Sequence, residues 1–177
     1  MGRRRRADTS GPRALPARPG AGPPPEVVVE TGGFAFVPPP GWEARKTPDG
    51  AVLGHRRIPG LLLVLRHGAQ TAAEMRSLAA GGLAAGGVLL TASGPCADHG
   101  PGGTVVPLAG TAGGSPVDAW GCLAPGPWGG GAAVLAVTSP GGIGPEHRQA
   151  VEELVASLRF LPPRPRTDRR PGKPPRP

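Results

Sequence analysis

The stretch GFAFVPPPGW, residues 33–42, begins with the pattern of a β-strand and then stops that strand with proline. Phe34 and Phe36 alternate with smaller apolar residues, so the two rings are expected on one face of a half-buried strand. Pro38 lacks the backbone N–H group that a sheet requires of its next residue. The strand must therefore end there or lie at the edge of its sheet.

The second half of this stretch predicts a tight turn that leads to an aromatic residue. Pro40 and Gly41 suit the two central positions of a type II turn, because proline presets φ and glycine accepts a positive φ. Trp42 follows at once, where the chain leaves the turn and points back toward the sheet. We therefore expect Trp42 to act as a large plug over the core.

Further strand patterns follow, separated by turns rich in glycine and proline. AVLGHRR (51–57) and LLLVLRH (61–67) predict a hairpin whose second strand is apolar on both faces and lies in the middle of a covered sheet. Pro107 predicts that its strand lies at an edge or bends. The remaining candidate strands are VLLTAS (88–93), TVVPLAG (104–110), VDAWGCL (117–123) and GAAVLAVTS (131–139).

Two segments have the pattern of amphipathic helices. In TAAE, Thr71 and Glu74 form a capping box, which predicts a helix that begins there and ends near the glycine pair 81–82. PEHRQAVEELVASLRF (145–160) has proline in its first turn and acidic residues early, which predicts a second helix. Its apolar stripe includes Leu154 and Leu158, and the segment closes at Phe160.

Together these patterns predict an α+β fold. We expect a mainly antiparallel sheet of about six to seven strands, flanked by two helices in an α/β/α sandwich. The strand 61–67 requires cover on both faces, and the two predicted helices can supply it.

The charge distribution separates this domain from two basic tails. The net charge of the 177-residue chain is +8, and residues 1–25 hold six arginines and one acidic residue. Residues 162–177 hold five arginines, one lysine and one acidic residue, whereas residues 26–161 hold eight basic and ten acidic residues. Both tails are rich in proline and poor in large apolar residues, so we expect them to be disordered around a single domain at 26–161.

No targeting segment is expected. The opening MGRRRR is not followed by the apolar run of a secretion signal, and no stretch has the length of a membrane helix. The two cysteines, Cys96 and Cys122, do not form a disulfide framework. We therefore expect a cytoplasmic protein with reduced thiols.

The two ends of the predicted domain resemble those of a known family. GFAFVPPPGW is similar to the F-x-hydrophobic-P-x-G-W start of the PsbP-like (Mog-PsbP) superfamily, and HRQAVEELVASLRF (147–160) resembles its last helix and following strand. The resemblance implies an antiparallel sheet with a helix on each face. It also implies a protein-binding role, because characterised members bind other proteins and share no catalytic motif.

Motifs that could carry chemistry are sparse. CADH places Cys96 and His99 in an expected glycine-rich loop, yet no second cluster completes a zinc site, and Cys122 lies in a strand pattern typical of a buried residue. GGIG (141–144) matches no phosphate-binding motif. The histidines have no obvious catalytic partners. We therefore expect no metal, no cofactor and no enzymatic activity.

Trp128 is the candidate contact with a partner. It lies among glycines in GPWGGG (126–131), at an expected loop tip where it either anchors a partner or folds back over the sheet. The sequence thus favours a protein-binding adaptor or chaperone-like module. The alternative is a nucleic-acid or polyanion binder acting through the arginine-rich tails, although these tails lack aromatic residues for base stacking.

Overall fold

The computed structural model describes residues 28–31, 33–100 and 102–163. The predicted disorder of residues 1–25, and of all but the first two residues of the 162–177 segment, lies outside the described residues.

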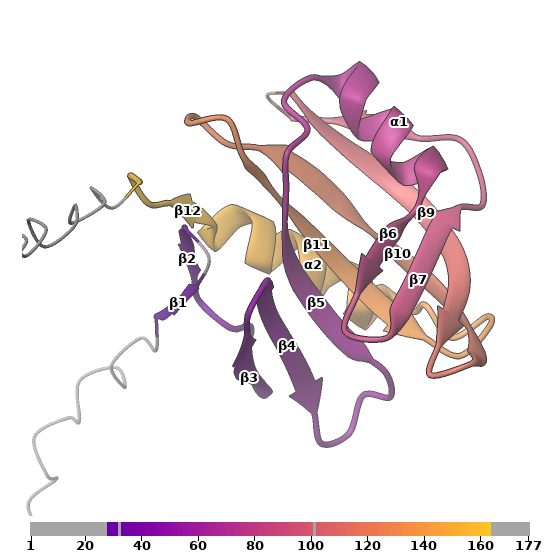
Figure 1. Cartoon of the computed structure of the whole chain (residues 1–177). Coiled ribbons are helices and arrows are strands. Elements are labelled where there is room, and N and C mark those ends of the chain that lie inside the picture. Colours follow the sequence, from indigo (N-terminus) through magenta and orange to yellow (C-terminus); the bar gives the residue numbers. More distant parts are fainter. Residues whose placement is uncertain (1–27, 32, 101, 164–177) are drawn as a thin grey trace, which may run out of the picture.

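Nine strands of the described chain form one antiparallel sheet (Figure 1). Eight strands follow one another along the sheet, and β8 pairs with β9 beside this path. In sheet order the strands are β3 (Trp42–Thr47), β4 (Gly50–His55), β5 (Leu61–His67), β11 (Gly131–Thr138), β10 (Ser115–Pro125), β9 (Gly103–Ala112), β7 (Val88–Ala92) and β6 (Leu83–Ala85), with β8 at Ala97–His99.

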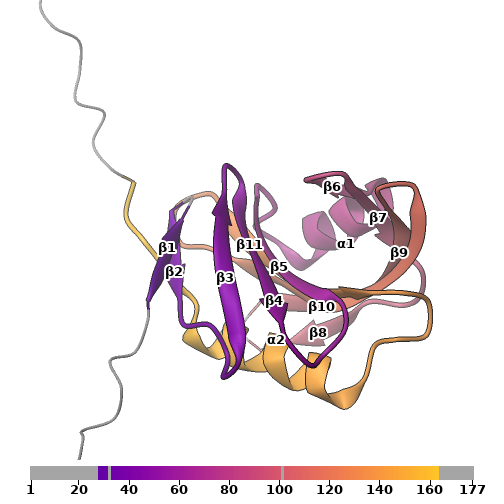
Figure 2. The same ribbon diagram turned by 90° about the horizontal axis from the view of Figure 1, so that it is seen from below.

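A second sheet joins the two ends of the described domain. Its three antiparallel strands are β1 (Val29–Thr31), β2 (Phe34–Phe36) and β12 (Arg159–Phe160), with β2 in the middle. The backbone N–H of Leu161 extends this pairing by donating to the carbonyl of Gly33 at 2.7 Å. The first and last described segments therefore lie side by side, as Figures 1 and 2 show.

The two helices begin at caps made by side chains. In α1 (Ala72–Gly81), the Thr71 hydroxyl accepts from the Glu74 N–H, and the Glu74 carboxylate accepts from the Thr71 N–H at 3.1 Å. The capping box expected at TAAE is therefore present. In α2 (Pro145–Ser157), the His147 Nδ1 atom accepts from the backbone N–H of Gly144 at 3.1 Å. Within the described part of the chain, neither helix has the length and apolar character to cross a membrane.

Strand β11 separates two hydrophobic clusters, because all its residues are buried. Val134 and its even-numbered neighbours face the cluster that contains α2, the small sheet and Trp42. Leu135 and its odd-numbered neighbours face the cluster that contains α1, β6, β7 and β9. The prediction that the apolar strand 61–67 lies in the middle of the sheet is confirmed, since β5 pairs with both β4 and β11.

The predicted α/β/α sandwich of six to seven strands is wrong. The protein is mostly antiparallel β-structure, and its main sheet curls into a half-barrel with α1 on the inner side and α2 on the outer side (Figure 2). The inner cluster is thus closed by β6, β7 and α1 together rather than by a layer of helix. Sheets acquire such curvature from the right-handed twist of long strands, here β9 and β10.

Of the two alternatives predicted from Pro107, an edge position or a bend, the edge position is wrong. Strand β9 lies inside the sheet, with β10 along one side and β8 and then β7 along the other. On this second side, β8 pairs with β9 as far as Val105 and β7 pairs with it from Leu108 onward. Pro107 therefore lies between the two partner strands. The missing N–H of proline therefore leaves no gap in either ladder.

The turn and the buried Trp42 of the opening stretch form as predicted, whereas the strand expected to be half-buried is buried on both faces, since Ala35 is also only 6% exposed. The backbone N–H of Trp42 donates to the carbonyl of Pro39 at 3.0 Å, and Gly41 has a φ of 82°. Trp42 is only 6% exposed, and its ring lies 5.4 Å from that of His55 and 6.5 Å from that of His147. Phe34 and Phe36 are 1% exposed and join the same cluster, as do Leu154, Leu158 and Phe160.

Candidate binding groove at Trp128

Trp128 is the exposed member of the three tryptophans. Its exposed fraction is 52%, whereas Trp42 is buried and Trp120 lies half-buried beneath the Arg148 guanidinium, whose carbon is 4.7 Å from the ring centre. Trp128 stands on the loop between β10 and β11, where Gly129 adopts a φ of 76°. Trp128 is thus one of the large apolar side chains that the described residues leave exposed, together with Val28 and Leu89.

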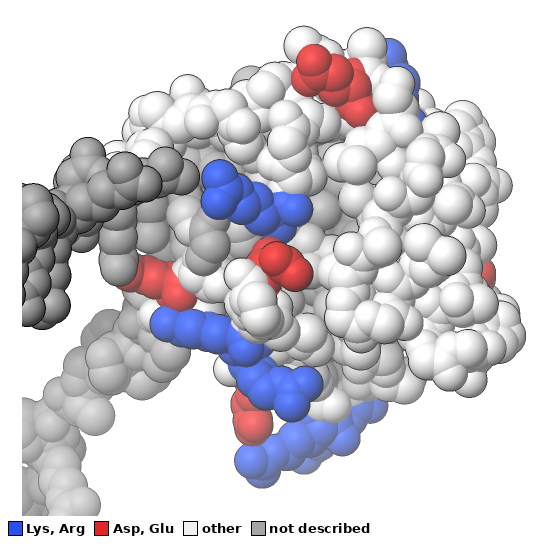
Figure 3. Space-filling view, in the orientation of Figure 1, with Lys and Arg blue, Asp and Glu red and all other residues white. Residues whose placement is uncertain are grey.

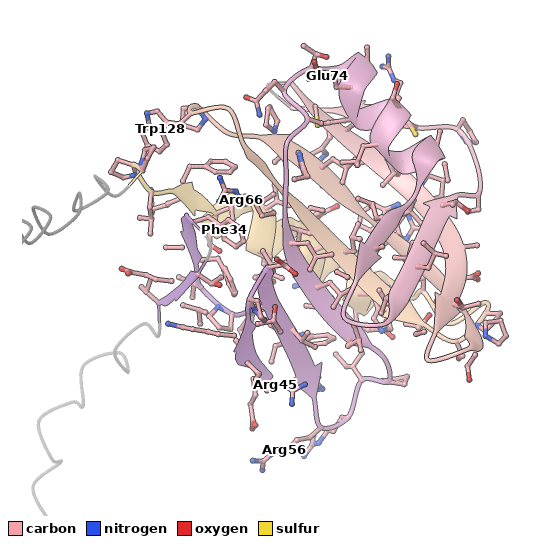
Figure 4. All side chains as sticks on the ribbon, in the orientation of Figure 1. Phe34, Arg45, Arg56, Arg66, Glu74 and Trp128 are labelled. Carbon is pink, nitrogen blue, oxygen red and sulfur yellow. The ribbon has the colours of Figure 1, made fainter. Side chains whose placement is uncertain are left out.

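A groove of about 620 Å³ lies beside Trp128. It is bounded by the hairpin of β1 and β2, by the 127–131 loop and by residues 160–163, with β3 and β5 contributing one basic side chain each. Trp128 and Arg66 lie on the same side of the molecule, near β12 (Figure 4). Segments from both ends of the described chain thus meet at one surface.

Aromatic and proline side chains form the apolar part of this groove. The ring of half-buried Phe160 packs against Gly126, where a Cβ atom would lie 2.8 Å from the ring carbon Cδ1. Glycine at position 126 is therefore needed for this close contact. Pro127, Pro162 and Pro163 extend the apolar surface around Trp128.

The polar part of the groove is mainly basic. Lys46 and Arg66 both line it and are both exposed, and neither forms an ion pair with any described residue. Glu30 contributes one opposing charge. In the space-filling view, basic side chains gather over β3 to β5 with acidic side chains among them, while most of the remaining face is uncharged (Figure 3).

The residues considered for metal or thiol chemistry do not come together. CADH was expected to be a loop, but its last three residues form the strand β8. The Asp98 carboxylate in this strand forms an ion pair with the Arg76 guanidinium at 2.7 Å. Burial raises the pKa of the Cys122 thiol to about 11, so this thiol is protonated at neutral pH and is a poor nucleophile. Among residues 28–31, 33–100 and 102–163, no group of three or more His, Cys, Asp and Glu side chains could hold a metal ion.

His67 is a buried polar residue that sequence reasoning missed. It lies at the end of β5, is 8% exposed, and neither ring nitrogen has a hydrogen-bond partner among the described residues. Its ring packs against Gly131, where a Cβ atom would lie 2.9 Å from Nδ1. The alternation of LLLVLRH contained the signal, because His67 follows Leu63 and Leu65 on one face of the strand.

His67 should make the stability of the protein depend on pH. Burial lowers its pKa below the ordinary value of 6.5, so the unfolded chain binds the proton more readily than the folded one. The His67 contribution is therefore retained above pH 6.5 and lost as pH falls toward the lowered value. We expect the free energy of unfolding, measured with urea, to fall less in His67→Leu than in wild type when the pH is lowered from about 7.5 to about 5. Equal losses in the two proteins would contradict this assignment.

Comparison with known proteins gives little further information. No family model and no curated protein matches the chain. It is weakly similar to a solved crystal structure from Bacteroides thetaiotaomicron VPI-5482, with 13% sequence identity and a TM-score of 0.43. The match covers 78% of this chain and 48% of that one, so the chain spans about half the length of that structure.

Proposed function

We propose that the protein is a non-enzymatic protein-binding module, an adaptor or chaperone-like domain that holds a segment of a partner in the Trp128 groove. The observation that carries this proposal is a half-exposed tryptophan at the rim of a groove lined by aromatic and proline side chains. Tryptophan is among the residues that contribute most to binding energy at protein interfaces.

Membership of the PsbP-like superfamily belongs to the same proposal. Its support is the resemblance of residues 33–42 and 147–160, together with the protein-binding role of characterised members.

A cytoplasmic location also belongs to the proposal, and the free thiols of Cys96 and Cys122 are compatible with it. The arginine-rich tails, on which the polyanion alternative rests, lie almost wholly outside the described residues. That alternative therefore becomes an outcome of the tests.

Trp128→Ala should abolish selective peptide binding without unfolding the protein. The full chain would be used to select peptides from an unbiased displayed library in the presence of nuclease. Affinity for the selected peptides should fall by about tenfold or more in the variant, as expected for an interface anchor. The matched control is Leu89→Ala, since Leu89 has a similar exposure of 55% but does not line the groove.

The two variants distinguish the groove from the rest of the surface. Loss of binding in Trp128→Ala and retention in Leu89→Ala supports the proposal. Equal effects of the two substitutions, or a selection that yields no peptide dependent on Trp128, would contradict it.

A further inference from the structure

We infer that the partner segment is acidic, with its carboxylates bound by Lys46 and Arg66 and an apolar side chain packed against Trp128 and Phe160. This inference rests on the proposed function and specifies the chemical class of the partner. It follows from the charges of the groove, from its edge strand and from the sequences attached to it.

The two basic side chains reach the groove from separate strands. Lys46 belongs to β3 and Arg66 to β5, with β4 between them. Among the described residues, Arg56 and Arg76 are the lysine or arginine side chains that form ion pairs, and of the other six only Lys46 and Arg66 line the groove. Two cations without acidic partners at one groove match a ligand that carries carboxylates, because charge-assisted hydrogen bonds are about twice as strong as neutral ones.

The Arg66 guanidinium is positioned for such a contact. A Cβ atom at Gly130 would lie 3.7 Å from its Nε atom and 3.9 Å from one terminal nitrogen. The guanidinium therefore runs under the same loop that presents Trp128. The backbone of Arg66 is held by its N–H, which donates to the carbonyl of Asp49 at 3.0 Å. A carboxylate on this guanidinium would bring the neighbouring side chain of the ligand next to the indole.

The groove favours recognition by side chains over strand addition. β12 is an edge strand of the small sheet, and residues 160–163 continue it along the groove. Pro162 and Pro163 have no backbone N–H, so an added strand could not complete its ladder of hydrogen bonds. The affinity must then come from the charged and aromatic side chains, which is where an acidic segment with an apolar residue has its contacts.

The sequences on either side of the described domain carry an excess of positive charge. The groove is lined by Glu30 and Thr31 near the first described residue and by Pro163 at the last one. Residues 164–177 carry five arginines, one lysine and one aspartate, and residues 1–25 carry six arginines and one aspartate. This excess of positive charge attracts an acidic partner toward the groove and disfavours binding of the chain's own basic ends to Lys46 and Arg66.

The test measures the affinity of full-length protein for a fluorescein-labelled Glu-Leu-Glu-Pro-Glu-Leu-Glu-Pro peptide by fluorescence anisotropy. Lys46→Gln and Arg66→Gln should each weaken binding by about tenfold, the range of a charge-assisted hydrogen bond. Glu30→Gln should strengthen binding, because it removes the opposing charge. The matched control is Arg45→Gln, which removes a charge from the neighbouring exposed position of β3 that does not line the groove.

Arg45→Gln should change the affinity by less than about twofold, as expected for an exposed charge screened by salt. An effect equal to that of Lys46→Gln would overturn the inference, because attraction would then be non-specific. So would absence of binding, or equal affinity for the peptide with glutamine in place of glutamate. A single-stranded oligonucleotide that displaces the peptide from wild type and from Lys46→Gln alike would assign binding to the tails and also overturn it.

The failure of this inference differs from the failure of the proposed function. Peptides from the unbiased selection would be sequenced and their Asp and Glu content compared with the starting library. Peptides that depend on Trp128 but show no acidic enrichment would retain the binding module and reject the acidic partner. Selection of no Trp128-dependent peptide would reject both.

Discussion

Trp42→Ala is expected to lower the free energy of unfolding by about 3–5 kcal/mol, the range for removing a buried tryptophan. The side chain is 6% exposed and fills the space between the small sheet, α2 and the first strands of the main sheet. Its removal would leave a cavity between elements that are far apart in sequence. Urea unfolding monitored by far-UV circular dichroism would measure the loss.

The control for this substitution is Trp128→Ala, which removes the same side chain from an exposed loop. We expect that variant to stay within about 1 kcal/mol of wild type, since surface substitutions rarely exceed such changes. If Trp42→Ala does not fold, Trp42→Phe should be measured in its place. This variant retains most of the buried volume, so it should fold and lose less of the free energy of unfolding than the alanine variant. Equal stability losses in Trp42→Ala and Trp128→Ala would contradict the assignment of Trp42 as the core plug.

The strands that could be predicted are those with local signals. Alternation and the type II turn gave the position of Trp42, and the doubly apolar strand 61–67 indicated its central place in the sheet. Both signals depend on neighbouring residues alone. Short strands gave no such signal: β6 and β8 contain three residues each and are paired with the longer strands β7 and β9.

The curl of the sheet could not be predicted from the sequence. Whether α1 covers a flat sheet or fills the inside of a half-barrel depends on the summed twist of β9 and β10. The residue pattern within one strand does not indicate this total twist. The sandwich prediction therefore failed although the helices and most strands were located correctly.

The candidate groove was predictable only at Trp128. An aromatic residue among glycines indicates an exposed anchor, but the residues around it come from β3, β5, β12 and the first hairpin. Lys46 and Arg66 line the same groove only through the pairing order of β3, β4 and β5, and Phe160 joins them only through its pairing with β2. The chemical character of the groove is thus a property of the register, and the sequence alone contains no local sign of it.

The same register predicts the effect of a single added methyl group. Gly121→Ala is expected to lower the free energy of unfolding by about 3 kcal/mol, at the upper end of the usual range for overpacking. A Cβ atom at Gly121 would collide with the backbone carbonyl of Val134 and lie 2.7 Å from the Cα atom of Leu135. Both contacts are to the backbone of β11, which is buried on both faces and cannot move aside.

Gly54→Ala is the matched control, because a Cβ atom at Gly54 in β4 would meet nothing within 4 Å. Its stability should stay within about 0.5 kcal/mol of wild type. Chemical denaturation of the two variants would measure the difference. A loss below about 1 kcal/mol in Gly121→Ala would mean that β10 and β11 can separate at this point. The hairpin that presents Trp128 would then be adjustable, and the groove would have to be formed by the ligand rather than by the fold.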